Sequence, residues 1–385
     1  MAGLCVVSAA IAAATVAPAE TCFALTLCVA FHAGIMLLPP QFVPLSAAGA
    51  RLQPSFAGIF DGTSRVVASR GGRLVLDRRS RARSRTTSAV RLGTCNPVIA
   101  AADGGSCAGG VDVLPPLHGK DNPTGPYACT VITAAADECG GGDRQRQHDS
   151  YRVILLYNRR RFTAVRCYSS DAGSWGPEAI VTGARVGRNQ LAGGPHAAVV
   201  RDGVVFWPRL AVALQLESLL HPPTPAARKK GKAPPPEPYT VAGFSTEKVK
   251  ADRLVGVMPD GRMLRVEADS ETIRAYWGGD GDRGIGSGGA ASLTGERLEW
   301  KWTMKQALMR VHTVRLRWLC DKSGIVIFTA RNGFDPDTDH VYTVDVETKR
   351  FTRVATAASG GPALVGEICG YEMDRETLLA SLGRR

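Results

Sequence analysis

The sequence predicts a mainly β protein of antiparallel hairpins, arranged either around a ring or as a sandwich. Apolar residues alternate with polar ones at a period of two along several segments, such as 298–302 and 314–318. Short turns, several of them with Asp or Gly, separate these segments. The 43 Gly and 23 Pro among 385 residues favour frequent turns over long helices.

Five hairpins are expected where two alternating runs flank a short turn. In chain order they cover residues 151–168, 197–207, 254–266, 315–330 and 340–354. Two of the turns contain the Asp-Gly pair that supplies the positive φ of a tight hairpin turn, Asp202-Gly203 and Asp260-Gly261. The stronger turn signals recur about every 60 residues, and this recurrence favours a propeller-like, kelch-like ring. The interval is somewhat longer than a kelch repeat.

The remaining elements are insertions, a turn and one helix. A Pro-rich insertion is expected at 219–238 and a Gly-rich loop at 278–292. Residues 334–339 (FDPDTD), whose Asp335, Asp337 and Asp339 could bind a cation, are interpreted as a turn, because Asp and Pro favour turns. A short C-terminal helix is expected, since Asp374 can cap it and Leu378, Leu379 and Leu382 give it an apolar face.

The N-terminal residues 1–45 form an apolar segment distinct from the β-rich body at 46–385. Residues 21–38 are an apolar run of marginal length for a membrane span. A signal peptide requires Lys or Arg before its apolar region, and none precedes this run. No basic cluster anchors either end of the run in a membrane. A buried helix or a poorly ordered start is the alternative to membrane attachment.

The net charge of +12 comes from two local runs. Residues 62–91 hold nine Arg and one Asp, and residues 226–232 hold four basic residues and no acid, so the rest of the chain is neutral in sum. The first run contains a possible basic patch of Arg78, Arg79, Arg81, Arg83 and Arg85. No aromatic residue is interleaved to stack on bases, so a solvated loop is favoured and no nucleic-acid partner is expected.

No motif for catalysis or for metal or cofactor binding stands out. The ten Cys contain no C-x-x-C pair, and the seven His are widely scattered. Residues 284–289 match G-x-G-x-x-G, but the expected flanking elements are strands rather than the strand and helix of a dinucleotide site. We therefore expect no metal, cofactor or catalytic residue, and no enzyme activity. The scattered thiols fit a reducing compartment, cytoplasmic or nuclear.

Several segments resemble the C-terminal region of F-box proteins of grasses. The stretch YRVILLYNRRRFTAVRCYSSDAGSWGPE (151–178) carries the resemblance most clearly. The other matching segments are residues 60–80, 111–117, 316–330, 340–355 and 368–382. The resemblance, which covers roughly residues 35–385, implies a propeller-like F-box-associated β domain of unknown function. In that family an N-terminal F-box docks on a Skp adaptor of a cullin ubiquitin ligase, and the β domain is thought to recruit the substrate protein.

The expected function is therefore a non-enzymatic protein-interaction domain, like the substrate-recruiting part of F-box proteins, with a protein partner. Residues 1–45 lack the L-P-x-x-L-L pattern of an F-box, so docking on the Skp adaptor is not expected of this chain. Three alternatives stay open: a basic nucleic-acid-associated protein using residues 73–91, a membrane-attached β protein using residues 21–38, and a hydrolase on a propeller scaffold.

Overall fold

The architecture is taken from a computed structural model of the chain. The structure describes these residues: 22–27, 41–45, 64–78, 89–97, 111–123, 125–133, 150–183, 185–192, 197–201, 203–220, 239–241, 243–245, 253–258, 260–269, 272–278, 297–303, 311–332, 335–354 and 367–372.

Within these residues, five sheets of four or more strands form the blades of a β-propeller. Blade 1 contains β3 (Arg65–Arg70), β4 (Arg73–Asp77), β5 (Leu92–Cys95) and β6 (Val111–Val113). Blade 2 contains β7 (Tyr127–Thr133), β8 (Tyr151–Asn158), β9 (Thr163–Ser169), β10 (Ser174–Trp175) and β11 (Ala179–Val181). The strand β15 (Tyr239–Val241) joins blade 2 by pairing with β11 in parallel.

The other three blades follow in chain order. Blade 3 contains β12 (Val199–Arg201), β13 (Val204–Trp207), β14 (Val212–Gln215) and β16 (Gly243–Ser245). Blade 4 contains β17 (Arg253–Val257), β18 (Met263–Ala268), β19 (Thr272–Trp277) and β20 (Arg297–Thr303). Blade 5 contains β21 (Val311–Leu319), β22 (Ile325–Asn332), β23 (Asp335–Asp345) and β24 (Phe351–Arg353). Short helices lie between strands: η2 (Gly119–Asp121), α5 (Arg188–Leu191), η3 (Pro208–Leu210) and α6 (Leu216–Leu220).

A three-stranded sheet, called here the closing sheet, joins the two ends of the described chain. It contains β1 (Cys22–Leu27), β2 (Gln41–Pro44) and β25 (Glu367–Glu372) in the order β2-β1-β25. The pairing of β1 with β25 is antiparallel over six residues, from Cys22 opposite Glu372 to Leu27 opposite Glu367. The closing sheet therefore combines residues on both sides of the boundary expected after residue 45.

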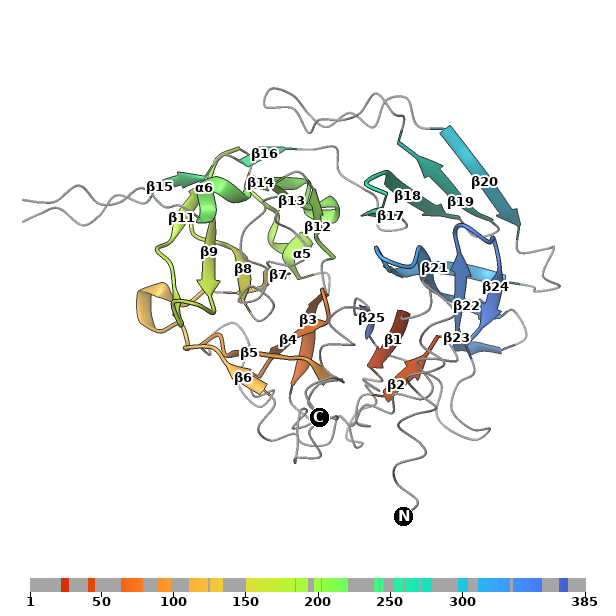
Figure 1. Ribbon diagram of the computed structural model, residues 1–385, viewed down its shortest axis with the longest axis horizontal. Helices are drawn as coiled ribbons and strands as arrows, with labels where there is room; N and C mark the ends of the chain where they lie inside the picture. Colours follow the sequence, from red (N-terminus) through yellow and green to blue (C-terminus); the bar gives the residue numbers. More distant parts are fainter. Residues whose placement is uncertain are drawn as a thin grey trace, which may run out of the picture.

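The blades surround a common centre, and one edge strand of each sheet faces it (Figure 1). These inner strands are β3, β7, β12, β17, β21 and β25. The strand β3 lies beside β7, β17 lies beside both β12 and β21, and β25 lies beside both β21 and β3. The closing sheet thus lies between blade 5 and blade 1. It fills the position at which the ring would otherwise be open.

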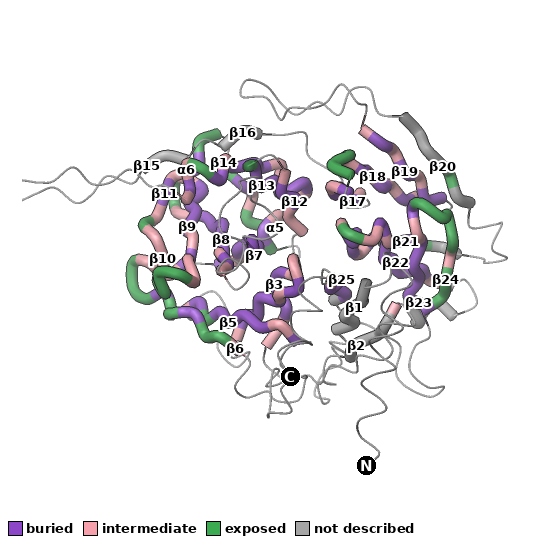
Figure 2. The backbone as a smooth tube through the Cα atoms, in the orientation of Figure 1, coloured by how far each residue is buried: buried purple, intermediate pink, exposed green. Residues whose placement is uncertain are grey.

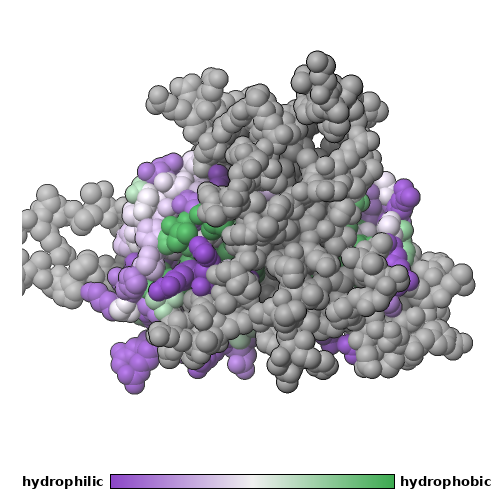
Figure 3. Space-filling view, turned by 90° about the horizontal axis from the view of Figure 1, so that it is seen from below, coloured by the Kyte–Doolittle hydropathy of each residue, from purple (hydrophilic) through white to green (hydrophobic). Residues whose placement is uncertain are grey.

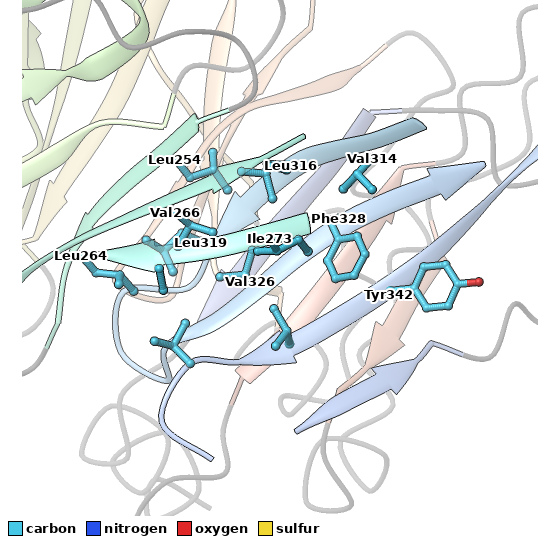
Figure 4. Close-up of a cluster of buried hydrophobic side chains, with 14 of the residues drawn as sticks. Leu254, Leu264, Val266, Ile273, Val314, Leu316, Leu319, Val326, Phe328 and Tyr342 are labelled. Atoms are coloured by element: carbon cyan, nitrogen blue, oxygen red, sulfur yellow. The ribbon is translucent and has the colours of Figure 1, made fainter. Parts of the chain in front are cut away.

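Apolar faces of neighbouring blades pack against each other. In blade 4, Leu264, Val266 and Ile273 pack against Val326 and Phe328 of blade 5 in one cluster of buried residues (Figure 4). A second cluster joins blades 2 and 3, and a third joins blades 1 and 2. Figure 2 shows buried residues along the middle strands and exposed residues at the turns. Along β18, half-buried and buried residues alternate from Met263 to Ala268. Such alternation is expected where one face of a strand packs against a neighbouring blade.

The five predicted hairpins are confirmed. They are β8–β9, β12–β13, β17–β18, β21–β22 and β23–β24, all antiparallel. Gly203 has φ +72° and Gly261 has φ +81°, the left-handed backbone that the Asp-Gly turns were expected to supply. The mainly β, propeller-like prediction is also confirmed, and the ring rather than the sandwich is the observed arrangement.

The interpretation of residues 335–339 as a turn is wrong. They begin β23, and Asn332 pairs with Asp335 while Arg331 pairs with Asp339. The three residues between Asp335 and Asp339 therefore form a bulge in the strand. A bulge interrupts the ladder of hydrogen bonds, which explains how Pro336, with no N–H to donate, is accommodated inside a strand.

The helical alternative for the apolar run 21–38 is also wrong where the structure describes it, because Cys22–Leu27 is the strand β1. None of the helices in the described ranges has the length and apolar character needed to cross a membrane. Four expectations lie outside the described residues: the C-terminal helix, the bulk of the insertion 219–238 beyond α6, the Gly-rich loop after Gly278, and the Lys run near 230.

Candidate interaction surface

The sequence-predicted basic patch is described only at its margins. Arg79, Arg81, Arg83 and Arg85 lie outside the described residues. Arg78 is half-buried, and its backbone N–H donates to the carbonyl of Arg91 over 2.8 Å. The connection from β4 to β5 carries the patch, and its two ends therefore lie next to each other at blade 1.

Asn122 connects that region to blade 2. Its Oδ1 accepts a hydrogen bond from the backbone N–H of Val90 over 2.9 Å, and its carbonyl accepts one from Arg159 Nη1 over 3.0 Å. Val90 ends the connection from β4 to β5, whereas Arg159 begins the β8–β9 turn. One residue thus holds the loop of blade 1, the segment after η2 and the turn of blade 2 together.

A third segment, residues 185–188, is fixed at the same end of blade 2. Asn158 Nδ2 donates to the carbonyl of Val186 over 2.7 Å. The backbone N–H of Val186 donates to Thr163 Oγ1 over 3.0 Å, and Thr163 Oγ1 donates to Asn158 Oδ1 over 3.1 Å. Since Asn158 ends β8 and Thr163 begins β9, these bonds place residues 185–188 directly beside the β8–β9 turn.

Two acidic side chains near these segments are already engaged. Glu178 Oε2 accepts hydrogen bonds from the Tyr157 hydroxyl over 2.5 Å and from Arg159 Nε over 2.8 Å. Asp121 Oδ1 accepts one from Arg166 Nη2 over 2.6 Å. Burial, and then the hydrogen bond to Glu178, raise the pKa of Tyr157, so this phenol keeps its proton. The arrangement is that of a structural network whose donors and acceptors satisfy each other.

Five cations on the same three segments have no such acid. We call them the basic rim: Lys120, Arg160, Arg161, Arg185 and Arg188. All five are exposed, and they form no ion pair with any residue in the described part of the chain. Because Arg159 and Arg166 already neutralise Glu178 and Asp121, no acid in the described part of the chain compensates the positive charge of the rim, whose backbone is well fixed.

Only part of this surface can be predicted from local sequence patterns. Arg159-Arg160-Arg161 is visible as a run, but it reads as an ordinary turn between two strands. Lys120, Arg185 and Arg188 are single residues in separate segments, and no local pattern brings them to the same turn. The bonds made by Asn122, Asn158 and Thr163 bring these segments together.

A hydrolase would need a metal site or a pair of a histidine and a carboxylate. They contain no group of three or more His, Cys, Asp and Glu residues that could hold a metal ion. His118 and His340 are the histidines whose side chains the structure describes. His118 is exposed, whereas His340 Nδ1 lies 3.1 Å from Arg353 Nη2, so within these ranges neither forms a pair with a carboxylate.

The described surface offers few large hydrophobic side chains. Val113, with 56% exposure, is the one exposed large hydrophobic residue in the described ranges. Figure 3 views the molecule from one edge and shows many hydrophilic residues on the described surface, with hydrophobic residues gathered in a small area. Trp175 of β10 is half-buried. It packs on Tyr168, and its Nε1 donates to the Pro115 carbonyl over 2.7 Å.

No protein-family model and no curated protein matches the chain. Solved structures to which the chain shows some similarity include one described as YCF48 bound to D1 peptide, with 11% identity, TM-score 0.32 and coverage of 77% of this chain and 68% of that one. A protein of unknown function from Dyadobacter fermentans has 10% identity, TM-score 0.35 and coverage of 79% and 84%. A prolyl endopeptidase has 9% identity and TM-score 0.34; the match covers 92% of this chain but about half, 51%, of the enzyme.

Proposed function

We propose that this protein is a non-enzymatic protein-interaction propeller, related to the substrate-recruiting part of F-box proteins. The observation that carries the proposal is the basic rim, whose exposed cations have no acid partner among the described residues and lie on a well-ordered end of blade 2. Loops mounted on a rigid scaffold are the usual place for binding residues. We place the protein in the cytoplasm or the nucleus, which fractionation of cell extracts would test.

The link to F-box proteins rests on the resemblance of the segments within residues 35–385. Binding to a purified Skp adaptor tests it in two arms. The native chain is expected not to bind the adaptor, because residues 1–45 lack an F-box pattern. A chimera with an F-box grafted before the chain is expected to bind it and to bring a set of cellular proteins to the ligase.

The experiment with the chimera tests whether the protein has an interaction function. Proteins whose abundance falls when the chimera is expressed are compared with those that fall with Arg160→Gln/Arg161→Gln. The variant is expected to spare proteins that the unmodified chimera removes. The proposal fails if the chimera assembles with the adaptor and yet no protein is removed in a rim-dependent manner.

A further inference from the structure

We infer that the basic rim binds an acidic, Asp- and Glu-rich segment of a partner protein. The inference rests on the proposed interaction function and names the chemistry of the partner. Four of the five rim cations are arginines. The planar guanidinium group presents paired N–H donors that match the two oxygens of a carboxylate, so an arginine cluster suits carboxylates better than scattered lysines do.

The charge around the rim is one-sided because of internal pairing. Arg159 and Arg166 are directed toward Glu178 and Asp121, with Arg159 Nε at 2.8 Å and Arg166 Nη2 at 2.6 Å from the acid oxygens. Because Glu178 and Asp121 are engaged in these two ion pairs, they are not available to neutralise the rim. Within the described residues, an incoming acidic segment therefore meets unpaired cations beside acids that are already paired, and it replaces solvent rather than an existing partner.

The backbone beneath the rim is already ordered. The β8–β9 turn is closed by the Arg159 N–H donating to the Phe162 carbonyl over 2.9 Å. Gln190 Oε1 accepts the backbone N–H of Gly187 over 2.8 Å, which fixes the start of α5 beside Arg188. Binding therefore costs side-chain entropy but little backbone entropy, which favours association through a small set of charges.

The surroundings of the rim favour a polypeptide over a nucleic acid. Single-stranded nucleic acids need aromatic faces on which bases stack. Tyr157, the aromatic residue next to Arg159, has no exposure, and its hydroxyl is bonded to Glu178. Phe162 is half-buried and packs on the cluster shared by blades 1 and 2. Within the described residues the rim thus offers charge without a stacking platform.

The test uses the full-length chain and fluorescence anisotropy at low salt. The probes are a labelled Glu/Ser peptide, the same peptide with Gln in place of Glu, and an oligothymidine of equal charge. The variants are Arg160→Gln/Arg161→Gln and Arg185→Gln/Arg188→Gln. The matched control is Arg315→Gln/Arg350→Gln on blade 5, which removes the same charge from two exposed arginines.

Each rim pair is expected to weaken binding of the Glu/Ser peptide by about tenfold, and the control by less than about twofold. Binding should also fall steeply as salt rises, and the Gln peptide should not bind. Circular dichroism and urea unfolding of all variants should match those of the wild type, since no rim side chain is bonded within the described residues.

Three outcomes overturn the inference: equal losses in rim and control variants, equal binding of the Glu and Gln peptides, or tighter rim-dependent binding of oligothymidine than of the peptide. The last would identify the rim as a nucleic-acid face. If no peptide binds while the grafted chimera still removes proteins in a rim-dependent manner, the acidic partner is wrong and the interaction function stands. If both experiments fail, both proposals fail.

Discussion

Arg70 and Asp321 form an ion pair although 251 positions separate them in the sequence. Arg70 Nη1 lies 3.2 Å from Asp321 Oδ2. Arg70 ends the inner strand of blade 1, and Asp321 follows the inner strand of blade 5. The inner strand of the closing sheet, β25, contacts both of those strands. The ion pair therefore connects the first and last full blades at the place where the ring closes.

This ion pair should contribute a small but measurable coupling energy. The side chains are 17% and 30% exposed, so solvent screens their attraction only in part. In a double-mutant cycle of Arg70→Gln and Asp321→Asn, a coupling of about 0.5–1 kcal/mol is expected in the free energy of urea unfolding. Strict additivity of the two single substitutions would show that the pair contributes nothing to closure.

A side chain at Gly370 should damage the same closure much more. A Cβ built on Gly370 of β25 would overlap the indole ring of Trp318 of β21, which is buried with 7% exposure. Gly370→Ala is therefore expected to lower the free energy of unfolding by about 1–3 kcal/mol, as overpacking does in cores.

Gly278→Ala is the control for that experiment. A Cβ at Gly278 would lie 3.5 Å from Met263 Cβ, an ordinary contact, so its effect should stay within about 0.5 kcal/mol. Equal effects of the two substitutions on urea unfolding would mean that Trp318 does not pack on Gly370 in solution.

The hairpins were predictable from the sequence because each is a local pattern. The Asp260-Gly261 turn and the alternating runs beside it contain all the information that the β17–β18 pair needs. The pairing of β1 with β25 brings together residues 22–27 and 367–372, and no local period signals which distant strand completes a sheet. The apolar run near the N-terminus consequently read as a helix or membrane segment.

The candidate surface was predictable only in part for a related reason. The sequence places the net positive charge in two runs of basic residues. In the first run, Arg79, Arg81, Arg83 and Arg85 lie outside the described residues. The rim instead gathers single cations from three segments, and Asn122 and Asn158 hold those segments together. A lone Asn in a sequence gives no sign of which backbone groups its amide will bind.

Cys167 should react slowly with alkylating reagents at pH 8. Burial raises the pKa of its thiol to about 12, whereas the nearby charge of Arg152 acts in the opposite direction. The thiolate, which is the reactive form, is then scarce at pH 8. Mass spectrometry after timed iodoacetamide treatment should show much slower modification of the half-buried Cys167 in the native protein than in urea. Rapid native labelling would show that the thiol is not desolvated as the structure has it.

Replacement of Tyr157 by Phe should change how stability depends on alkaline pH. Burial, and then the hydrogen bond to Glu178, raise the pKa of Tyr157 in the folded state above that of the unfolded chain, which is about 10. The folded protein therefore holds this proton more tightly. The resulting stability is fully present below about pH 10 and is lost as pH rises toward the folded pKa.

Tyr157→Phe removes the proton, the hydrogen bond that the hydroxyl donates to Glu178 and the one that it accepts from Arg166 Nε. At pH 8 the variant should be less stable than the wild type by about 1 kcal/mol, because Glu178 keeps its bonds to Arg159 but loses one donor. Above pH 10 the difference should shrink by up to about 1.4 kcal/mol per pH unit, because only the wild type then loses this contribution. Urea unfolding at a series of pH values measures both effects. A difference that stays constant or widens above pH 10 would mean that Glu178 and burial do not hold the phenol in its protonated form.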